Sequence, residues 1–409
     1  MRFRFLSLLA FPLLLIFASC EKRNFTEDSS AKLSFSSNEI FFDTLFKGIG
    51  SATQRFNVYN PNSQPVKIST VQLEGGSSSP YSLNIDGRPA NSVSGYELNG
   101  KDSMFIFAEL KIDQSKPSNP YIVKDSIKFL TNGNRQFLRL KGYGQQAKFY
   151  NDTVVTSNET WQSSNTYVIV DQMLVDEDVT LSIQEGTEIY GTGGALIFIA
   201  GTMQAQGTKE DPIVFQGHRP EDSYNNVPGQ WQGLHFLPTS KNNFLSYTTI
   251  TEGIVGIRVD SFSTQGDTIP KVQLNNVHIK NMTNYGILGF STNILATNTI
   301  VSESCGSLVS GIYGGNYQFF HCTFANNGCK CSSDDPGLFF TNRVLEDPDA
   351  GPISFDLNVV LENSIAWGSD EEEFILANEG PKDVNASVSH NLLKTSNQNY
   401  NTNGNILNK

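Results

Sequence analysis

Residues 33–148 contain short runs in which apolar and polar residues alternate, separated by turn signals such as NPNSQP, DGRPAN and TNGN. Alternation over four to eight residues predicts half-buried β-strands. It places Phe56 with Val58, and Ile127 with Phe129, on common faces. Seven or eight such strands in about 115 residues predict an immunoglobulin-like β-sandwich.

A different pattern begins at residue 149, where a six-residue phrase recurs: apolar, any, polar, small, any, apolar. Its copies start at Leu245, Leu274, Leu295, Phe319, Val360 and Val388, which are 29, 21, 24, 41 and 28 residues apart. A unit of this size cannot bury its apolar side alone, so successive units are expected to stack as a parallel β-solenoid. We expect Leu245, Leu274, Leu295 and Phe319 to line up in one interior column. His321 and His390 hold the polar third position of the phrase and are expected to form corners.

Composition narrows the classes of partner. Charged residues make up 17% of the chain and hydrophobic residues 38%, and the formal net charge is −12. Nucleic-acid binding needs Lys and Arg to neutralise phosphates, and a polybasic contact with anionic lipid needs the same residues. The charge therefore argues against both.

The first twenty residues, MRFRFLSLLAFPLLLIFASC, predict export. Arg2 and Arg4 precede an apolar run from Leu6 to Phe17 that is too short to span a membrane. Small residues stand directly before Cys20, an arrangement that resembles the lipobox of bacterial lipoproteins. The resemblance implies a signal peptide over residues 1–19, a lipidated Cys20 and an outer-membrane location. Residues 20–32 are polar and are interpreted as a tether.

Longer motifs resemble two known domain families. The opening FSSNEIFFDT, the strand FNVYNP and the closing LRLKGYG resemble Hydin-type immunoglobulin-like domains. The stretch VTLSIQEGTEIYGTGGALIFIAGTMQAQGTKEDPIVFQG, followed by GQWQGLHF, resembles the right-handed, pectin-lyase-like β-helix of exported bacterial proteins. The fold class expected is all-β: an immunoglobulin-like sandwich over residues 33–148, then a right-handed parallel β-helix over residues 149–409. The closing tail NQNYNTNGN either caps the last coil or leaves it frayed.

Four cysteines follow Cys20, and sequence alone allows three pairings among them. A zinc site is disfavoured because Cys329 and Cys331 form CxC rather than CxxC, with no His pair at finger spacing. Cys305 and Cys329 each lie ten residues after a phrase start, which predicts stacking within disulfide range. Cys322 holds the small position of its phrase and is expected to be a buried free thiol.

No constellation of residues names a reaction. Glu252 and Glu303 stand at nearly matching offsets, with Asn281 between them, but no base matches their position. The catalytic residues are therefore left unknown, and no metal or cofactor is expected. Amphipathic aromatics offer a binding role instead. The candidates for stacking on sugar rings are Trp161, Trp231 and Trp367, with a packed corner as the alternative for Trp231.

Five positions carry Asp followed by Ser or Thr and then an apolar residue. This motif is similar to the acceptor of general O-glycosylation in Bacteroidota and implies outward-facing glycans. The candidate acceptors are Thr44, Ser103, Ser126, Thr153 and Thr268.

These features favour a lipid-anchored cell-envelope protein whose β-helix binds a polysaccharide or another surface protein without turnover. One alternative is a polysaccharide lyase or glycoside hydrolase with its groove along the β-helix. Another is a structural surface component. The side of the outer membrane on which the protein stands is left open.

Overall fold

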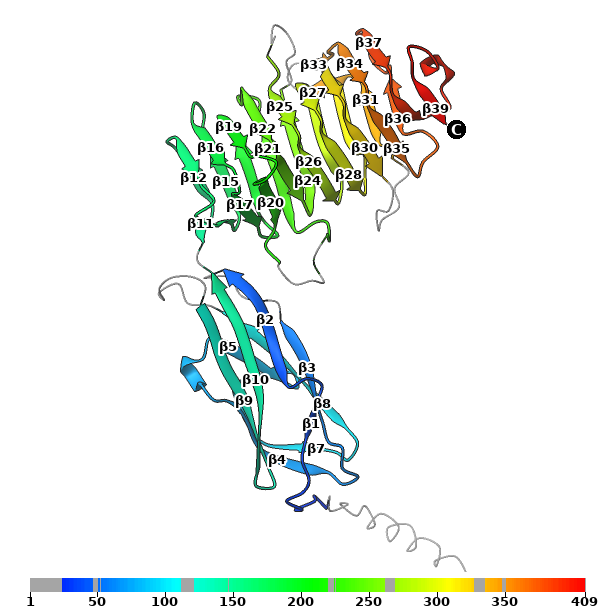
Figure 1. The fold of residues 1–409 in the computed structure, drawn as a ribbon. Coiled ribbons are helices and arrows are strands. Elements are labelled where there is room, and N and C mark those ends of the chain that lie inside the picture. The colour runs from blue at the N-terminus through cyan, green and yellow to red at the C-terminus, as the bar shows by residue number, and fades with distance from the viewer. Residues whose placement is uncertain are drawn as a thin grey trace, which may run out of the picture. The chain divides into compact units, whose positions relative to one another are not determined.

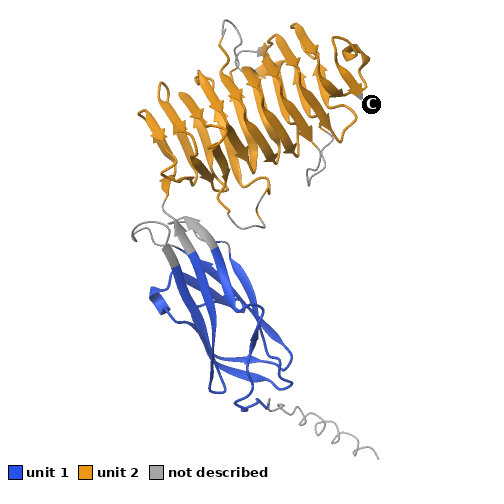
Figure 2. Cartoon of the chain, viewed as in Figure 1, with its two compact units in different colours: residues 1–145 blue, residues 146–409 orange. Residues whose placement is uncertain are grey.

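The structure is a computed structural model that describes residues 24–46, 51, 53–111, 121–145, 147–219, 224, 226–261, 269–326, 335–347 and 351–408. The chain divides into two compact units, residues 1–145 and residues 146–409 (Figure 2). The signal peptide, Cys20, Thr268 and Cys329 lie outside the described residues. No helix in the described ranges is long and apolar enough to cross a membrane.

The first unit is a β-sandwich of two five-stranded sheets (Figure 1). The first sandwich sheet has the order β1 (Ser34–Phe35), β3 (Gln54–Tyr59), β8 (Ser103–Leu110), β5 (Tyr81–Ile85) and β6 (Arg88–Pro89). The second has the order β2 (Glu39–Phe46), β10 (Asn134–Gln145), β9 (Tyr121–Thr131), β4 (Val66–Leu73) and β7 (Ser92–Leu98). A 3-10 helix, η2 (Gly76–Ser78), lies between β4 and β5.

Alternation along these strands builds the sandwich core, as expected. Phe56 and Val58 are buried, and so are Ile127 and Phe129 on the second sheet. Neighbouring strands are antiparallel except β2 and β10, which run parallel. The predicted sandwich is therefore confirmed, and its assignment to the Hydin-type family stays a prediction.

The second unit is a solenoid whose coils each add one strand to parallel sheets (Figure 1). The first solenoid sheet contains β12 (Thr153–Val155), β15 (Gln172–Val175), β18 (Leu196–Ile199), β21 (Trp231–Phe236), β24 (Gly253–Asp260), the first halves of β27 (Tyr285–Thr297) and β29 (Val309–Phe320), β31 (Leu338–Thr341) and β36 (Phe374–Ala377). Because β27 and β29 continue around a corner, they also belong to the second solenoid sheet.

The other two faces follow the same stacking. The second solenoid sheet contains β13 (Glu159–Trp161), β16 (Thr180–Gln184), β19 (Thr202–Gln206), β22 (Asn243–Ser246), β25 (Val272–Asn275), the second halves of β27 and β29, β34 (Leu357–Glu362) and β37 (Val384–Ser389). The third contains β11 (Lys148–Tyr150), β14 (Tyr167–Ile169), β17 (Glu188–Gly191), β20 (Ile213–Gly217), β23 (Thr248–Thr251), β26 (His278–Met282), β28 (Ile300–Ser304), β30 (Thr323–Asn326), β35 (Ile365–Gly368), β38 (Leu392–Lys394) and β39 (Ile406–Asn408). A hairpin of β32 (Leu345–Asp347) and β33 (Gly351–Ile353) completes the strands described.

The expected interior column exists, with one residue corrected. In the second solenoid sheet, Leu245 pairs with Leu274, Leu274 with Ala296, and Ala296 with Phe319. Leu295 is therefore outside the column and faces outward, because the side-chain period of a strand is two.

The corner residues explain where each phrase begins. In four of the six copies the third position has positive φ, for example 55° at Asn276, but in the third and fifth copies the fourth position has it instead, 50° at Asn298 and 52° at Asn363. Asn tolerates this left-handed conformation better than most residues. If every copy is taken to start two residues before its positive-φ corner residue, the third copy starts at Ala296 and the fifth at Leu361. His321 and His390 also have positive φ, 55° and 57°, so the prediction that they form corners is confirmed.

The closing tail covers the end of the solenoid core. The 3-10 helix η4 (Gln398–Tyr400) brings the Tyr400 ring to 5.1 Å from the ring of Phe374. Asn405 accepts a hydrogen bond from the Asn391 backbone N–H and donates one to the carbonyl of Val388. Of the two alternatives for the tail, the structure shows the cap.

The structure tests some of the predictions about the cysteines. Cys322 is a buried free thiol, as predicted, and burial raises its pKa to about 11. Cys305 is disulfide-bonded, and its partner is not among the described residues. Since the column contains Ala296 rather than Leu295, Cys305 lies nine residues after its phrase start instead of ten. The equal-offset argument for Cys329 therefore fails, and that pairing stays a prediction.

Candidate functional site

The outer face of the first solenoid sheet carries a strip of aromatic and charged side chains from successive coils. Strand register places Phe198 on β18 beside His235 on β21, and His235 beside Arg258 on β24. Two residues further along β24, Asp260 pairs with Phe290 on β27. Alternation directs these side chains outward, because Ile257 and Val259 on the same strand lie in the core. We call this set the outer strip.

Asp260 contacts both His235 and Arg258 at the centre of the outer strip. Its Oδ2 lies 2.8 Å from His235 Nε2, and both of its oxygens accept hydrogen bonds from Arg258, from Nε at 3.0 Å and from Nη2 at 2.9 Å. The side chain of Asp260 is only 7% exposed, whereas that of Arg258 is 40% exposed. The carboxylate therefore orients a cation that remains accessible to a ligand.

Aromatic rings extend the outer strip on both sides of this ionic centre. The ring of Phe198 lies 5.4 Å from that of His235. The Arg258 guanidinium lies 5.0 Å from the centroid of the Phe290 ring, within the range of a cation–π contact. Phe290 in turn stacks on Tyr313 at 5.8 Å, and Arg343 lies over the Tyr313 ring.

The charge state of Asp260 follows from these contacts. Burial alone would raise the pKa of Asp260, but the hydrogen bonds and positive charges of His235 and Arg258 outweigh burial and lower it. The carboxyl group is therefore ionised at neutral pH. An ionised carboxylate with both oxygens engaged is suited to holding Arg258 and unsuited to donating a proton.

Residues 153–260 match the pectate-lyase like beta helix domain.

The β-helix domain match covers the coils from β12 to β24 and therefore includes Phe198, His235, Arg258 and Asp260. No curated protein matches the chain. The solved structures similar to it include a family 123 glycoside hydrolase from Clostridium perfringens, at 13% identity and a TM-score of 0.23. That similarity covers 33% of this chain, which spans only 31% of the hydrolase chain.

Two further similar structures cover more of the chain. The GH87 alpha-1,3-glucanase from Streptomyces thermodiastaticus is 10% identical, with a TM-score of 0.24 and coverage of 86% of this chain and 70% of that one. The family 28 exopolygalacturonase from Yersinia enterocolitica is 10% identical, with a TM-score of 0.22 and coverage of 87% and 94%. Similarities this low carry no argument about activity.

Of the tryptophans considered for stacking on sugars, the prediction for Trp161 is wrong, and for Trp231 the structure shows the packed alternative. Trp161 and Trp231 are each 1% exposed and point into the core of the β-helix. Trp231 donates a hydrogen bond from Nε1 to the carbonyl of Thr251, and its ring stacks on Phe215. Trp367 on β35 is partly exposed, and its role stays a prediction. On the outer strip, the partly exposed aromatic residues are Phe198, Phe290 and Tyr313.

The acids at matching offsets in the sequence share one corner of the β-helix. Glu252, Asn281 and Glu303 all have positive φ, at 66°, 56° and 55°. The Glu252 carboxylate is buried and accepts hydrogen bonds from the backbone N–H groups of Asn226 and Gly217. Burial raises its pKa, against the effect of these bonds and of Lys280. Glu252 therefore anchors the segment before β21.

Four of the five predicted O-glycosylation acceptors lie in described strands. Ser103 is exposed at the start of β8, Ser126 lies in β9, Thr153 begins β12 and Thr44 lies in β2. Their glycosylation stays a prediction. Among the described residues, no group of three or more His, Cys, Asp or Glu side chains could hold a metal ion.

Replacing Asp260 with Asn should lower the free energy of unfolding at neutral pH by about 1.5–3 kcal/mol, because charge-assisted hydrogen bonds to His235 and Arg258 weaken. The folded state lowers the pKa of Asp260 from its ordinary 3.8. Its contribution is therefore complete well above that pH and is lost as the pH falls through the folded-state value. The difference between wild type and variant should shrink in acid.

Urea unfolding followed by tryptophan fluorescence measures this difference, since all three tryptophans lie in the second unit. The control is Asp178→Asn, whose partner Lys241 is 61% exposed while Asp178 is 85% exposed. Exposed pairs contribute little, so this variant should unfold like wild type. Equal losses in the two variants would contradict the role assigned to Asp260.

Proposed function

We propose that the protein is a lipid-anchored cell-envelope protein that binds a glycan along the outer strip without cleaving it. The observation that carries the binding role is the continuous series of partly exposed rings and cations. It runs from Phe198 through Arg258 and Phe290 to Tyr313 and Arg343. Neighbouring coils place these groups about 4.8 Å apart, so a chain-like ligand would meet a similar group at each step.

The chemistry of the outer strip suits carbohydrate. Aromatic side chains present an apolar ring face on which the C–H face of a sugar can pack. Arg258 offers donors to ligand hydroxyl groups, and its carboxylate partner keeps it in place. The envelope location and the lipid anchor rest on residues 1–20, where the basic start, the apolar run and Cys20 resemble a lipoprotein signal.

Cleavage of the glycan is the competing function. Glycoside hydrolases use a pair of carboxyl groups, one of which must donate a proton. In the outer strip, Asp260 is ionised and engaged by His235 and Arg258. This arrangement favours binding, and the experiment below includes a measurement of product release.

The proposal is tested with the soluble chain from residue 21, titrated with a panel of bacterial and plant polysaccharides. Phe290→Ala should weaken binding by roughly tenfold, the loss expected for one aromatic contact of about 1.4 kcal/mol. The matched control is Phe244→Ala, a partly exposed phenylalanine on β22 of the second solenoid sheet. It should bind like wild type.

Equal binding by Phe290→Ala and Phe244→Ala would contradict a site on the outer strip. Release of oligosaccharides by wild type, lost in His235→Ala, would replace the binding function with an enzymatic one.

A further inference from the structure

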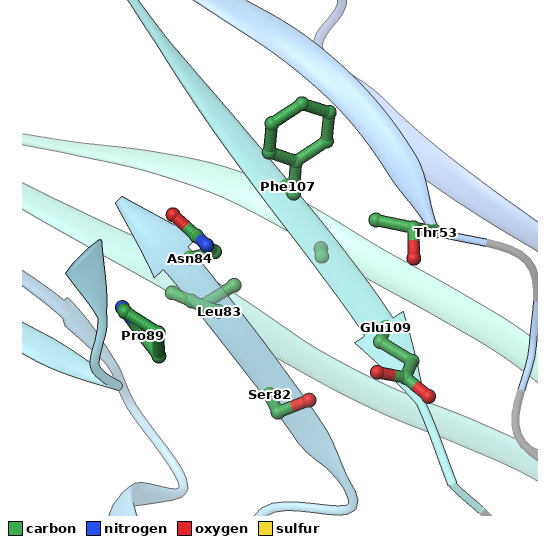
Figure 3. A pocket seen from close by; sticks show the side chains of 8 residues that line it. Thr53, Ser82, Leu83, Asn84, Pro89, Phe107 and Glu109 are labelled. Atoms are coloured by element: carbon green, nitrogen blue, oxygen red, sulfur yellow. The ribbon is translucent and has the colours of Figure 1, made fainter. Parts of the chain in front are cut away.

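The outer surface of the first sandwich sheet contains a pocket at its β5–β6 edge (Figure 3). Its volume is about 460 Å³, within the range of small-molecule sites. The side chains that define it are Thr53, Ser82, Asn84, Pro89, Phe107 and Glu109. We call it the sandwich pocket.

Strand register explains why these side chains meet. On the neighbouring strands β5 and β8, Ser82 pairs with Glu109 and Asn84 pairs with Phe107. Residues two apart on a strand share a face, so the four side chains form a block on the outer surface. Pro89 on β6 lies opposite Asn84 and closes one side of the block.

Hydrogen-bonding capacity in the sandwich pocket is left unused by the protein. The Oδ1 atom of Asn84 is buried and has no hydrogen-bond partner. Within the described residues, the side chains of Thr53, Ser82 and Glu109 also make no hydrogen bond or ion pair. A buried polar atom without a partner costs free energy, and a turn of the Asn84 amide that presents its oxygen to a ligand in the pocket would recover it.

The mixture of groups points to one kind of ligand. Phe107 and Pro89 supply an apolar surface, whereas Asn84, Ser82 and Glu109 supply polar groups around it. A sugar ring has an apolar C–H face and a rim of hydroxyl groups that both donate and accept. Its hydroxyl groups would therefore satisfy the Asn84 amide in either orientation. The Glu109 carboxylate only accepts, so it favours hydroxyl donors and repels anionic ligands.

We propose that the sandwich pocket binds one unit of an uncharged glycan, with the sugar ring on Phe107 and its hydroxyl groups on Asn84 and Glu109. The site lies in the first unit and is independent of the outer strip. Together with the outer strip, it gives the protein two proposed carbohydrate sites, one on each compact unit.

The test uses the chain from residue 21 and the methyl glycosides of neutral hexoses and N-acetylhexosamines as probes, with binding measured by saturation-transfer NMR and titration. Phe107→Ala should weaken the binding of the best probe by roughly tenfold or more. The matched control is Phe137→Ala, whose side chain is 50% exposed on the second sandwich sheet. Glu109→Gln keeps the shape of an exposed side chain and should weaken binding severalfold. It provides a second test of the site if Phe107→Ala folds poorly.

Three outcomes would overturn the proposal: no probe binds, Phe107→Ala and Glu109→Gln bind like Phe137→Ala, or methyl glucuronate binds more tightly than the neutral probes. Phe290→Ala should bind the probes like wild type. A loss of probe binding in Phe290→Ala would assign the sugar to the outer strip and also overturn the sandwich pocket. Failure of polysaccharide binding at the outer strip would leave the result on the sandwich pocket unaffected.

Discussion

Replacing Gly233 with Ala should destabilise the β-helix by about 3 kcal/mol or more. Gly233 has a φ of +117°, which L side chains rarely adopt, and a Cβ there would lie 1.6 Å from the carbonyl oxygen of Val255. The register between β21 and β24 shifts directly after this residue. An added methyl group would therefore push apart the two strands that hold His235 and Arg258.

Tryptophan fluorescence during urea unfolding measures the loss, because Trp161, Trp231 and Trp367 all lie in the second unit. The matched control is Gly193→Ala, where an added Cβ meets no atom within 4 Å and φ is not positive. Its free energy of unfolding should change by less than about 0.5 kcal/mol. Similar losses at both glycines would show that the close approach at Gly233 is not the cause.

Trp231→Ala should lower the free energy of unfolding by about 3–5 kcal/mol, the usual cost of removing a large buried aromatic side chain. The ring of Trp231 stacks parallel to Phe215 at 6.3 Å with an interplanar angle of 11°. Its Nε1 donates a 2.8 Å hydrogen bond to the carbonyl of Thr251. The substitution would leave a cavity and remove this hydrogen bond to the Thr251 carbonyl.

Trp367→Ala is the comparison for Trp231→Ala, since Trp367 is partly exposed on the third solenoid sheet. Its removal should cost about 1 kcal/mol or less. Both variants keep Trp161 as a fluorescent reporter. If Trp367→Ala were as damaging as Trp231→Ala, burial would not distinguish these two tryptophans.

The repeated phrase was sufficient to predict the solenoid but not its register. Leu295 is more apolar than Ala296, so the sequence favours Leu295 as the interior residue. The structure selects Ala296 because the corner at Asn298 has positive φ and the interior residue stands two positions before it. A rule based on corner asparagines and histidines would have aligned five of the six copies, since the corner of the first copy is Tyr247.

The outer strip was not predicted because its members are far apart in sequence and no local motif joins them. Asp260 is 25 residues from His235, and Phe290 is 30 residues from Asp260. Coil lengths vary from one turn to the next, so offsets counted from a phrase start do not show which side chains are neighbours. The outer strip could have been found by aligning the outward-facing residues of successive strands from one coil to the next.

The sequence by itself determined the class of structure: alternating strands that need a second sheet, then short units that must stack to bury their apolar sides. Only the tertiary structure decided which side faces water in strands that carry apolar residues on both sides, such as the one with Leu295 and Ala296, because a shift of one residue exchanges the two faces. That choice buried Trp161 and Trp231 and exposed Arg258. It also placed Asp260 beside His235 and Arg258, which keep its carboxyl group ionised. These contacts depend on the register between coils, and the connecting turns differ in length from one coil to the next.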